Sequence, residues 1–362
     1  MKDKKNRNWF SFVLSLLLTV CLVCIPCFSL AGGQGDSTIS VVVTAFPAYD
    51  FVRQIAGGKV QLTMLLPVGA ESHFYEPTPR DLITIRDCDV FIYVGGQSEA
   101  WVERVLESID TENMRIISLM DSADLLEEEF VEGMTHDHDE DHDDDHDHDE
   151  DHDDDHDHDD DHDHDEDHDH DEDHDHDDDH DHQHDGVAFD EHVWTSPINV
   201  MRIASHLAEV FAEIDPANAD VYRGNAAVFQ EQLAVLDAAF RNVVDNAVRT
   251  TVVFADRFPF RYFTEEYGLT YYAAFSGCST STDPTVRTIS FLIDKVRAEE
   301  IPVVFHLELS NENVANLISE ATGARKLKLH SGHNLTRSDF EAGVTYVELM
   351  TRNVEALKEA LW

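Results

Sequence analysis

The sequence predicts an α/β protein in which two doubly wound lobes are joined by a single long helix. Short apolar segments with the character of buried strands alternate with helical patterns in both halves of the chain, which is typical of parallel sheets with helices on both faces. Between the halves, apolar residues recur at alternating spacings of four and three over about 30 residues. This spacing predicts one helix that buries a single face along its whole length.

The first half of the chain contains four predicted strands. Their residues are β-branched, apolar and nearly continuous, which is typical of strands that are buried on both faces. They cover residues 39–44, 60–66, 90–94 and 116–119. Thr78 and Pro79 have the chemistry of a helix N-cap and a first helical residue. We assign residues 36–214 to an N-terminal α/β lobe.

The long helix is predicted at residues 215–247, where Asp215 and Pro216 form a strong helix start. Its apolar face consists of Tyr222, Ala226, Phe229, Leu233, Leu236, Phe240 and Val243. A helix of about 30 residues is roughly 45 Å long. Since it joins two lobes, it should permit little hinge motion between them.

The alternation of strand and helix resumes after the long helix and defines a C-terminal lobe at residues 248–362. The predicted strands of this lobe cover residues 251–254, 270–274, 303–307 and 326–329. Asp283 and Pro284 start a helix between them, in the same way as Asp215 and Pro216.

The N-terminus predicts an exported protein. Basic residues at positions 2–7 precede an apolar run at 9–30, and the small residues Ser29 and Ala31 suit cleavage of a signal peptide after residue 31. One alternative is an uncleaved membrane anchor, because the run is long enough to span a bilayer. Another is a lipoprotein, since Cys21, Cys24 and Cys27 lie in this run, although each follows Val or Pro and not a small residue. Each outcome places the chain in the periplasm or at the cell surface. Cys88 and Cys278 remain in the mature chain, where free thiols are expected.

Most of the charge lies in one segment of low complexity. The chain has 362 residues and a net charge of −50, and residues 136–185 contain 32 Asp or Glu, 17 His and one Gln. The charge excludes nucleic-acid binding by phosphate neutralisation. A segment without apolar residues is expected to be a disordered loop, which we place at 135–186. Its alternating imidazoles and carboxylates favour a flexible, unselective chelator of divalent metals.

Two loops outside this segment carry candidate metal ligands. Residues 67–79 follow a predicted strand and contain His73, and residues 190–197 contain His192. Ligand crevices in open α/β sheets lie at the carboxyl ends of the strands. Either histidine alone would more often be structural. Both lie beside carboxylates that could orient an imidazole, and together they favour a metal site.

These loops resemble those of the metal-specific solute-binding proteins of ABC importers. Residues 67–81 match the family loop that carries the first ligand, which implies His73, and residues 190–197 match the loop of the second ligand, which implies His192. The start of the long helix at 215–218 and the position of the His- and acid-rich segment also match. The resemblance covers nearly all of the mature chain.

The resemblance implies a binding protein and not an enzyme. It would carry zinc or manganese to a membrane permease with its ATPase, and we expect it to act as a monomer. The alternatives are a manganese receptor of the same family, an extracellular metal buffer or adhesin without a transporter, and, less favoured, a metal-dependent hydrolase with three protein ligands and an open water position.

The C-terminal lobe departs from the family pattern. The family usually places a His or Glu ligand five residues before a Tyr-Phe pair, and Arg257 occupies that position here. A guanidinium stays charged and cannot bind a cation. The resemblance places the fourth ligand of the family some dozen residues before Tyr346, in the loop at 330–334. The hypothesis is therefore a zinc site formed by His73, His192 and His333 with one carboxylate.

Two carboxylates and one further histidine remain open as candidates in this lobe. The oxygen ligand would be Glu308 or Asp256, Arg257 would pair with whichever of the two does not bind the metal, and His330 is the alternative to His333. Nitrogen-rich tetrahedral coordination favours Zn²⁺ over Mn²⁺. His206 is expected on the surface of a helix, and His306 in a buried strand as a hydrogen-bonded core residue.

Overall fold

The computed structural model describes residues 38–134, 188–279 and 284–362. The side chain of His73 is not among the described groups, and the predicted signal peptide and the His- and acid-rich segment lie outside the described residues. Within the described ranges, none of the helices is both long enough and apolar enough to cross a bilayer. Residues Ile39 to Trp362 form one compact unit.

The N-terminal lobe contains a parallel sheet of four strands in the order β2-β1-β3-β4. The strands are β1 (Ile39–Val43), β2 (Val60–Met64), β3 (Val90–Tyr93) and β4 (Arg115–Ser118). The predicted strands are confirmed, with ends that differ by one or two residues. Pairing of β1 with both β2 and β3 places the point where the strand order reverses at the carboxyl end of β1.

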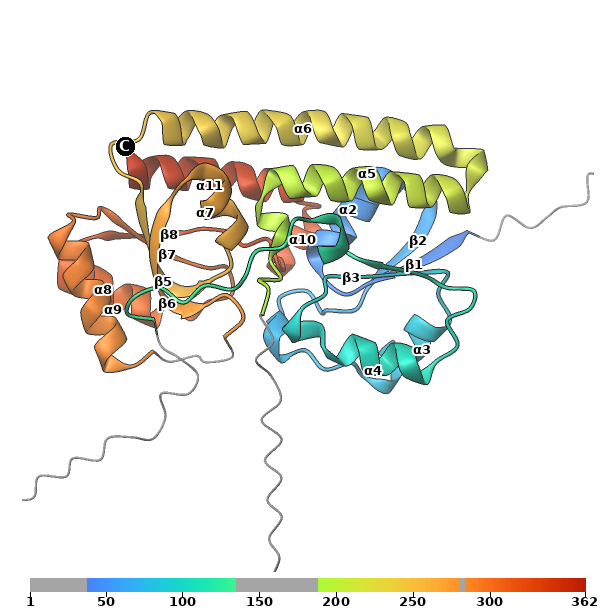
Figure 1. Ribbon diagram of the computed structural model, residues 1–362, viewed down its shortest axis with the longest axis horizontal. Helices are drawn as coiled ribbons and strands as arrows, with labels where there is room; N and C mark the ends of the chain where they lie inside the picture. Colours follow the sequence, from blue (N-terminus) through green and yellow to red (C-terminus); the bar gives the residue numbers. More distant parts are fainter. Residues whose placement is uncertain (1–37, 135–187, 280–283) are drawn as a thin grey trace, which may run out of the picture. The chain divides into compact units, whose positions relative to one another are not determined.

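Helices cover both faces of this sheet (Figure 1). They are α2 (Phe46–Ala56), α3 (Pro79–Arg86) and α4 (Trp101–Ser108), with 3-10 turns η1 (Ser72–Phe74), η2 (Gln97–Glu99) and η3 (Met120–Ser122). Val41 and Val43 of β1 face the core beneath α2, whereas Val42 faces the separate cluster beneath α3 and α4. Successive strand residues point to opposite faces, and both faces are apolar, so the sheet needs helices on each side.

The C-terminal lobe repeats this architecture. Its parallel sheet has the order β6-β5-β7-β8. The strands are β5 (Thr251–Phe258), β6 (Thr270–Ser276), β7 (Val303–His306) and β8 (Arg325–Lys328). The helices are α7 (Arg261–Tyr267), α8 (Val286–Ala298), α9 (Asn313–Thr322), α10 (Arg337–Glu341) and α11 (Tyr346–Leu361). The prediction of two doubly wound lobes is confirmed.

Two helices connect the sheets. After the 3-10 turn η4 (Val193–Thr195), the chain forms α5 (Pro197–Ile214), a short turn η5 (Pro216–Asn218) and then α6 (Ala219–Asp245). The helix α6 packs on α2 and α5 of the first lobe and on α11 of the second, and Figure 1 shows it running above both sheets. All seven residues of the predicted apolar face are buried. The long helix is therefore confirmed.

The buried face of α6 belongs to one hydrophobic core that reaches both sheets. This core includes Val41 of β1, Phe229 of α6 and Phe254 of β5. The two lobes also bond directly: the Tyr346 N–H of α11 donates to the buried carboxylate of Asp50 in α2 over 2.8 Å. The lobes are thus packed together and are not linked by a hinge alone.

Candidate metal centre

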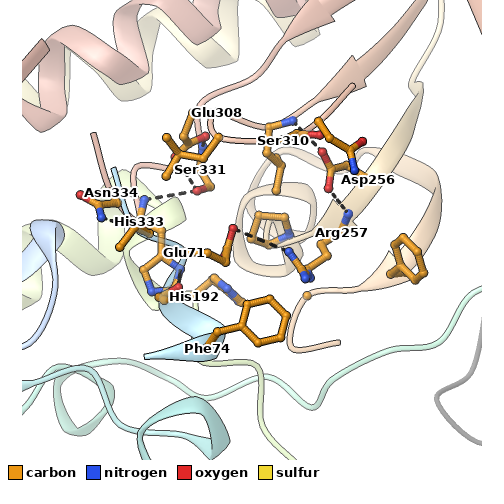
Figure 2. Close-up of a pocket in the computed structure, with 18 of the residues that line it drawn as sticks. Glu71, Phe74, His192, Asp256, Arg257, Glu308, Ser310, Ser331, His333 and Asn334 are labelled. Atoms are coloured by element: carbon orange, nitrogen blue, oxygen red, sulfur yellow. Dashed lines mark hydrogen bonds and ion pairs between the residues drawn. The ribbon is translucent and has the colours of Figure 1, made fainter. Parts of the chain in front are cut away.

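A cavity of about 240 Å³ lies where loops from both sheets meet. Its residues follow the carboxyl ends of strands, as expected for a ligand site in open α/β sheets. The first lobe contributes Ala70, Glu71, Ser72, Phe74 and His192, and the second contributes chiefly Asp256, Arg257, Glu308, Ser310, Ser331, His333 and Asn334. Figure 2 shows these side chains converging from the two lobes.

His192 is fully buried at the cavity wall. Asp190 Oδ1 lies 3.0 Å from its Nδ1 and also accepts the His192 backbone N–H over 2.8 Å. A carboxylate at Nδ1 fixes the ring and the tautomer, and leaves the Nε2 lone pair for a metal. Burial disfavours the charged imidazolium, but the Asp190 carboxylate favours it and raises the pKa of His192 above its ordinary value.

His333 faces His192 from the opposite lobe. The centroids of the two imidazole rings are 5.6 Å apart with the rings nearly perpendicular. Ser72 Oγ lies 3.1 Å from His333 Nδ1, which joins the loop of His73 to the loop of His333. The cavity therefore has an imidazole from each lobe. The loops of His73 and His192 in the first lobe both contact the loop of His333 in the second.

Trp194 and Asn334 hold these loops together. The Trp194 Nε1–H donates to the Ser331 carbonyl over 2.9 Å, and the indole ring lies 4.9 Å from the His333 ring. The Asn334 amide donates to the carbonyls of Pro67 and Ala70 at 2.9 and 2.8 Å. The positions of the imidazoles are thus determined by buried hydrogen bonds that span both lobes.

Glu308 lines the cavity but already binds the His333 loop. Its carboxylate accepts the Ser331 N–H and Oγ–H, each over 2.7 Å, and the Gly332 N–H over 2.9 Å. Burial raises the pKa of Glu308, while these three donors oppose the shift. A buried donor that loses its hydrogen-bond partner destabilises the fold by about 1–3 kcal/mol. Moving the Glu308 carboxylate to a metal would therefore be energetically unfavourable.

Asp256 is engaged in a similar way. Its Oδ1 accepts the Arg257 backbone N–H over 2.9 Å, and its Oδ2 accepts the Leu307 N–H over 3.1 Å. The carboxylate joins the end of β5 to the residue after β7. It lines the cavity, yet its contacts are those of a structural acceptor.

The remaining histidines occupy three different environments. His330 does not line the cavity; its backbone N–H donates to Asn353 Oδ1 and its carbonyl accepts from Asn353 Nδ2. His306 is buried with Nδ1 3.0 Å from the Leu307 carbonyl, as predicted for a core histidine. His206 is exposed on α5, also as predicted.

His73 lies in η1, between Ser72 and Phe74, which both line the cavity. Its backbone is therefore at the cavity, while its side chain is not among the described groups. Among the side chains that are described, no three from His, Cys, Asp or Glu lie close enough together to hold a metal ion. A site made from this cavity needs His73 or a shift of the side chains around it.

Arg257 and Glu71 form a contact that sequence reasoning missed. The sequence predicts that Arg257 pairs with Glu308 or Asp256, and the structure shows an ion pair of its guanidinium with Glu71 of the opposite lobe, at 3.7 Å. Its Nε–H donates to the Ser279 carbonyl over 2.6 Å. Only the strand-end position of Glu71, two residues before His73, could have indicated it as a cavity residue.

Gly277 allows the chain after β6 to pass close to His192. A Cβ atom at Gly277 would lie 2.8 Å from the Phe258 carbonyl oxygen and 3.2 Å from His192 Cε1. A side chain at this position would displace the imidazole or the strand end. The glycine is therefore part of what positions His192.

A half-buried carboxylate, that of Glu99, lies at the end of β3 in the N-terminal lobe. Glu99 Oε2 accepts the N–H groups of Val94 and Gly95 at the end of β3, over 2.7 and 3.0 Å. Burial raises the pKa of Glu99 to about 7, from a usual value near 4.5. The folded state thus holds Glu99 protonated over a pH range in which the unfolded chain ionises it.

This difference predicts a pH-dependent stability. A raised pKa stabilises the fold fully below pH 4.5, and this contribution is lost as pH rises to about 7. The loss amounts to about 3 kcal/mol. Glu99→Gln should therefore match the wild type near pH 4.5 and exceed its free energy of unfolding at pH 8, as measured by urea unfolding across this range.

The control for this prediction is Glu103→Gln, at an exposed position of α4. It should change the free energy of unfolding little at any pH. A constant difference between Glu99→Gln and wild type from pH 4.5 to pH 8 would contradict the assignment of the shift to Glu99.

The protein has two α/β lobes, each with a parallel sheet, which share one core. Two histidines from opposite lobes face each other in the cavity between them. This architecture is that of a two-lobed solute-binding protein of the metal-binding type. The chain belongs to the family described as zinc-uptake complex component A, periplasmic, which matches residues 41–360. The family consists of binding proteins and not of enzymes, and its periplasmic description agrees with the predicted export.

Individual relatives support this assignment. The chain is 27% identical over 326 residues to the zinc-binding lipoprotein AdcA of Streptococcus pneumoniae, covering 90% of this chain and 56% of that protein. It is 26% identical over 331 residues to the high-affinity zinc uptake system protein ZnuA of Bacillus subtilis, covering 91% and 90%. The chain thus spans only about half the length of the pneumococcal protein.

A solved structure has the same fold. The Zn(II)-bound ZnuA-like domain of Streptococcus pneumoniae AdcA superposes with a TM-score of 0.66 at 24% identity, covering 90% of this chain and 99% of that one. At this identity the comparison supports the fold, and the ligands must be argued from the cavity itself.

Proposed function

We propose that this protein is an extracytoplasmic receptor that binds Zn²⁺ between its lobes and delivers it to an ABC importer. The single observation that carries the proposal is the pair of imidazoles from opposite lobes, His192 and His333, facing each other at 5.6 Å across one cavity. The names of the relatives, a zinc-binding lipoprotein and a zinc uptake protein, support zinc as the cargo.

The proposed ligands are His73, His192 and His333 with one oxygen donor. Imidazole nitrogen suits zinc, whereas manganese prefers more oxygen ligands. The Asp190 contact to His192 Nδ1 is the carboxylate partner that zinc-binding histidines usually have. A manganese receptor of the same family is the second candidate, and the nitrogen-rich set weighs against it.

The partner would be a permease and ATPase in the membrane. Since one core packs against both sheets, a large rotation of the lobes would expose buried apolar surface. Release would instead come from small shifts of the loops at residues 67–79 and 330–334 when the receptor contacts the permease. The His- and acid-rich segment at 136–185 would collect divalent metal near this receptor.

The test is a competition titration with Zn²⁺ and Mn²⁺ on the mature protein and on a version that lacks residues 136–185. The proposal expects one tight zinc site in both proteins, with only weak sites lost in the shortened one. If tight binding disappears with the segment, the cavity is not the receptor site, and a metal buffer without a transporter becomes the better account.

A further inference from the structure

The cavity holds a carboxylate that the site hypothesis above did not include. Glu71 lines the cavity from the first lobe, and its Oε2 lies 3.7 Å from Arg257 Nη1 of the second lobe. Figure 2 shows the Glu71 carboxylate between the imidazoles of His192 and His333 on one side and the guanidinium on the other. The Glu71 carboxylate thus lies between the proposed metal position and the Arg257 guanidinium.

We propose that Glu71 is the oxygen ligand of the zinc site and that Arg257 is the residue that positions it. This deepens the function proposed above and rests on it. The oxygen ligand would come from the loop of His73 in the first lobe, while the second lobe supplies His333 and the guanidinium. Arg257 would then be a positioning residue that acts through a ligand of the opposite lobe.

The hydrogen bonds of the other two candidates favour Glu71. Glu308 accepts three hydrogen bonds from Ser331 and Gly332, and Asp256 accepts two from backbone N–H groups. Either carboxylate would have to give up some of these bonds, or distort a strand end, to reach a metal. The 3.7 Å contact between Glu71 and Arg257 is longer than a hydrogen bond, so a shift of the Glu71 carboxylate toward a metal would break no hydrogen bond between these two side chains.

The surroundings of Arg257 show how it could hold Glu71. The arginine side chain is 11% exposed, its Nε–H donates to the Ser279 carbonyl, and its guanidinium carbon lies 5.9 Å from the centre of the Phe74 ring. These contacts fix the guanidinium at the cavity wall. A carboxylate has two oxygens, so Glu71 can keep one near Arg257 while the other binds zinc.

The loop geometry brings Glu71 to the right place. The next residue, Ser72, contacts the His333 imidazole at 3.1 Å, so the backbone of Glu71 lies beside the imidazoles. The described side chains are not yet close enough to hold a metal, and zinc would draw Glu71 and the imidazoles inward. A carboxylate between zinc and Arg257 would also screen the repulsion between the two positive charges.

A double-mutant cycle on the full chain tests this inference. Zinc affinity is measured by competition with a chelator for wild type, Glu71→Gln, Arg257→Gln and the variant with both changes. Glu71→Gln should weaken zinc binding at least 10- to 100-fold, and Arg257→Gln about 10-fold. If Arg257 acts through Glu71, the variant with both changes should be no weaker than Glu71→Gln alone.

Two further readouts separate positioning from general damage. The visible spectrum of bound Co²⁺ should change in Glu71→Gln, because an oxygen ligand is lost, and should stay unchanged in the control Glu76→Gln, an exposed residue of the same loop that does not line the cavity. Arg257→His should restore zinc affinity in the Glu71→Gln background, because it puts an imidazole on the cavity wall in place of the guanidinium.

The inference is overturned if Glu71→Gln binds zinc as tightly as Glu76→Gln, or if Arg257→Gln weakens binding equally with and without Glu71. Failure of the proposed function has a different signature, because wild type itself would then show no tight zinc site. Tight wild-type binding that His192→Ala removes and Glu71→Gln keeps would overturn the role of Glu71 alone.

Discussion

His192→Ala is expected to weaken the tightest zinc site by more than about 100-fold, because it removes a proposed ligand whose imidazole is oriented by Asp190. The imidazole is fully buried at the cavity wall. Competition titration against a chelator measures the change, and thermal unfolding without metal checks that the variant is folded.

The matched control is His206→Ala, which removes an exposed imidazole from α5, away from this cavity. Its zinc affinity should equal that of the wild type. Asp190→Asn should give an intermediate loss of about 10- to 100-fold, since it removes the carboxylate that orients His192. Tight zinc binding that survives His192→Ala would show that the metal site lies elsewhere.

Phe240→Ala is expected to lower the free energy of unfolding by about 3–5 kcal/mol. Phe240 lies on the buried face of α6 and has no exposed surface. Its ring packs edge-on against Phe263 at 4.8 Å and near Tyr267 at 5.4 Å. The substitution would leave a cavity where α6 meets the C-terminal lobe, and urea unfolding would measure the loss.

Val235→Ala is the control on the same helix. Val235 is 72% exposed, so its truncation should change the free energy of unfolding by less than about 0.5 kcal/mol. A loss below about 1 kcal/mol for Phe240→Ala would mean that α6 is not anchored to the second lobe by this aromatic cluster.

The fold could be predicted from the sequence because its signals are local and repeated. Each strand is an apolar run with helices around it, and the seven apolar positions of α6 follow a helical period that the structure buries in full. The ends of the strands could be predicted less accurately. Strand β5 extends to Phe258, beyond the predicted end at residue 254, and its pairing with β6 shifts register between Phe254 and Arg257. A register shift of this kind leaves no signature in periodicity.

The candidate site was predictable only in part. His192 and His333 both line one cavity, and their loops are indicated by the resemblance to the ligand loops of the family. The role of Glu308 could not be foreseen, since its three hydrogen bonds come from a loop that follows another strand. The contact between Glu71 and Arg257 joins residues 186 positions apart, and only the packing of the lobes brings them together.

The shared core also limits how this protein could have diversified. Because the buried face of α6 belongs to a core that includes residues of both sheets, neither sheet with its own helices has a complete core. Proteins built from independent domains can exchange or lose one by recombination, but a gene fragment that encodes one lobe of this chain would leave half of α6 without a partner. Changes in metal preference would therefore arise by substitution of the residues that line the cavity between the sheets.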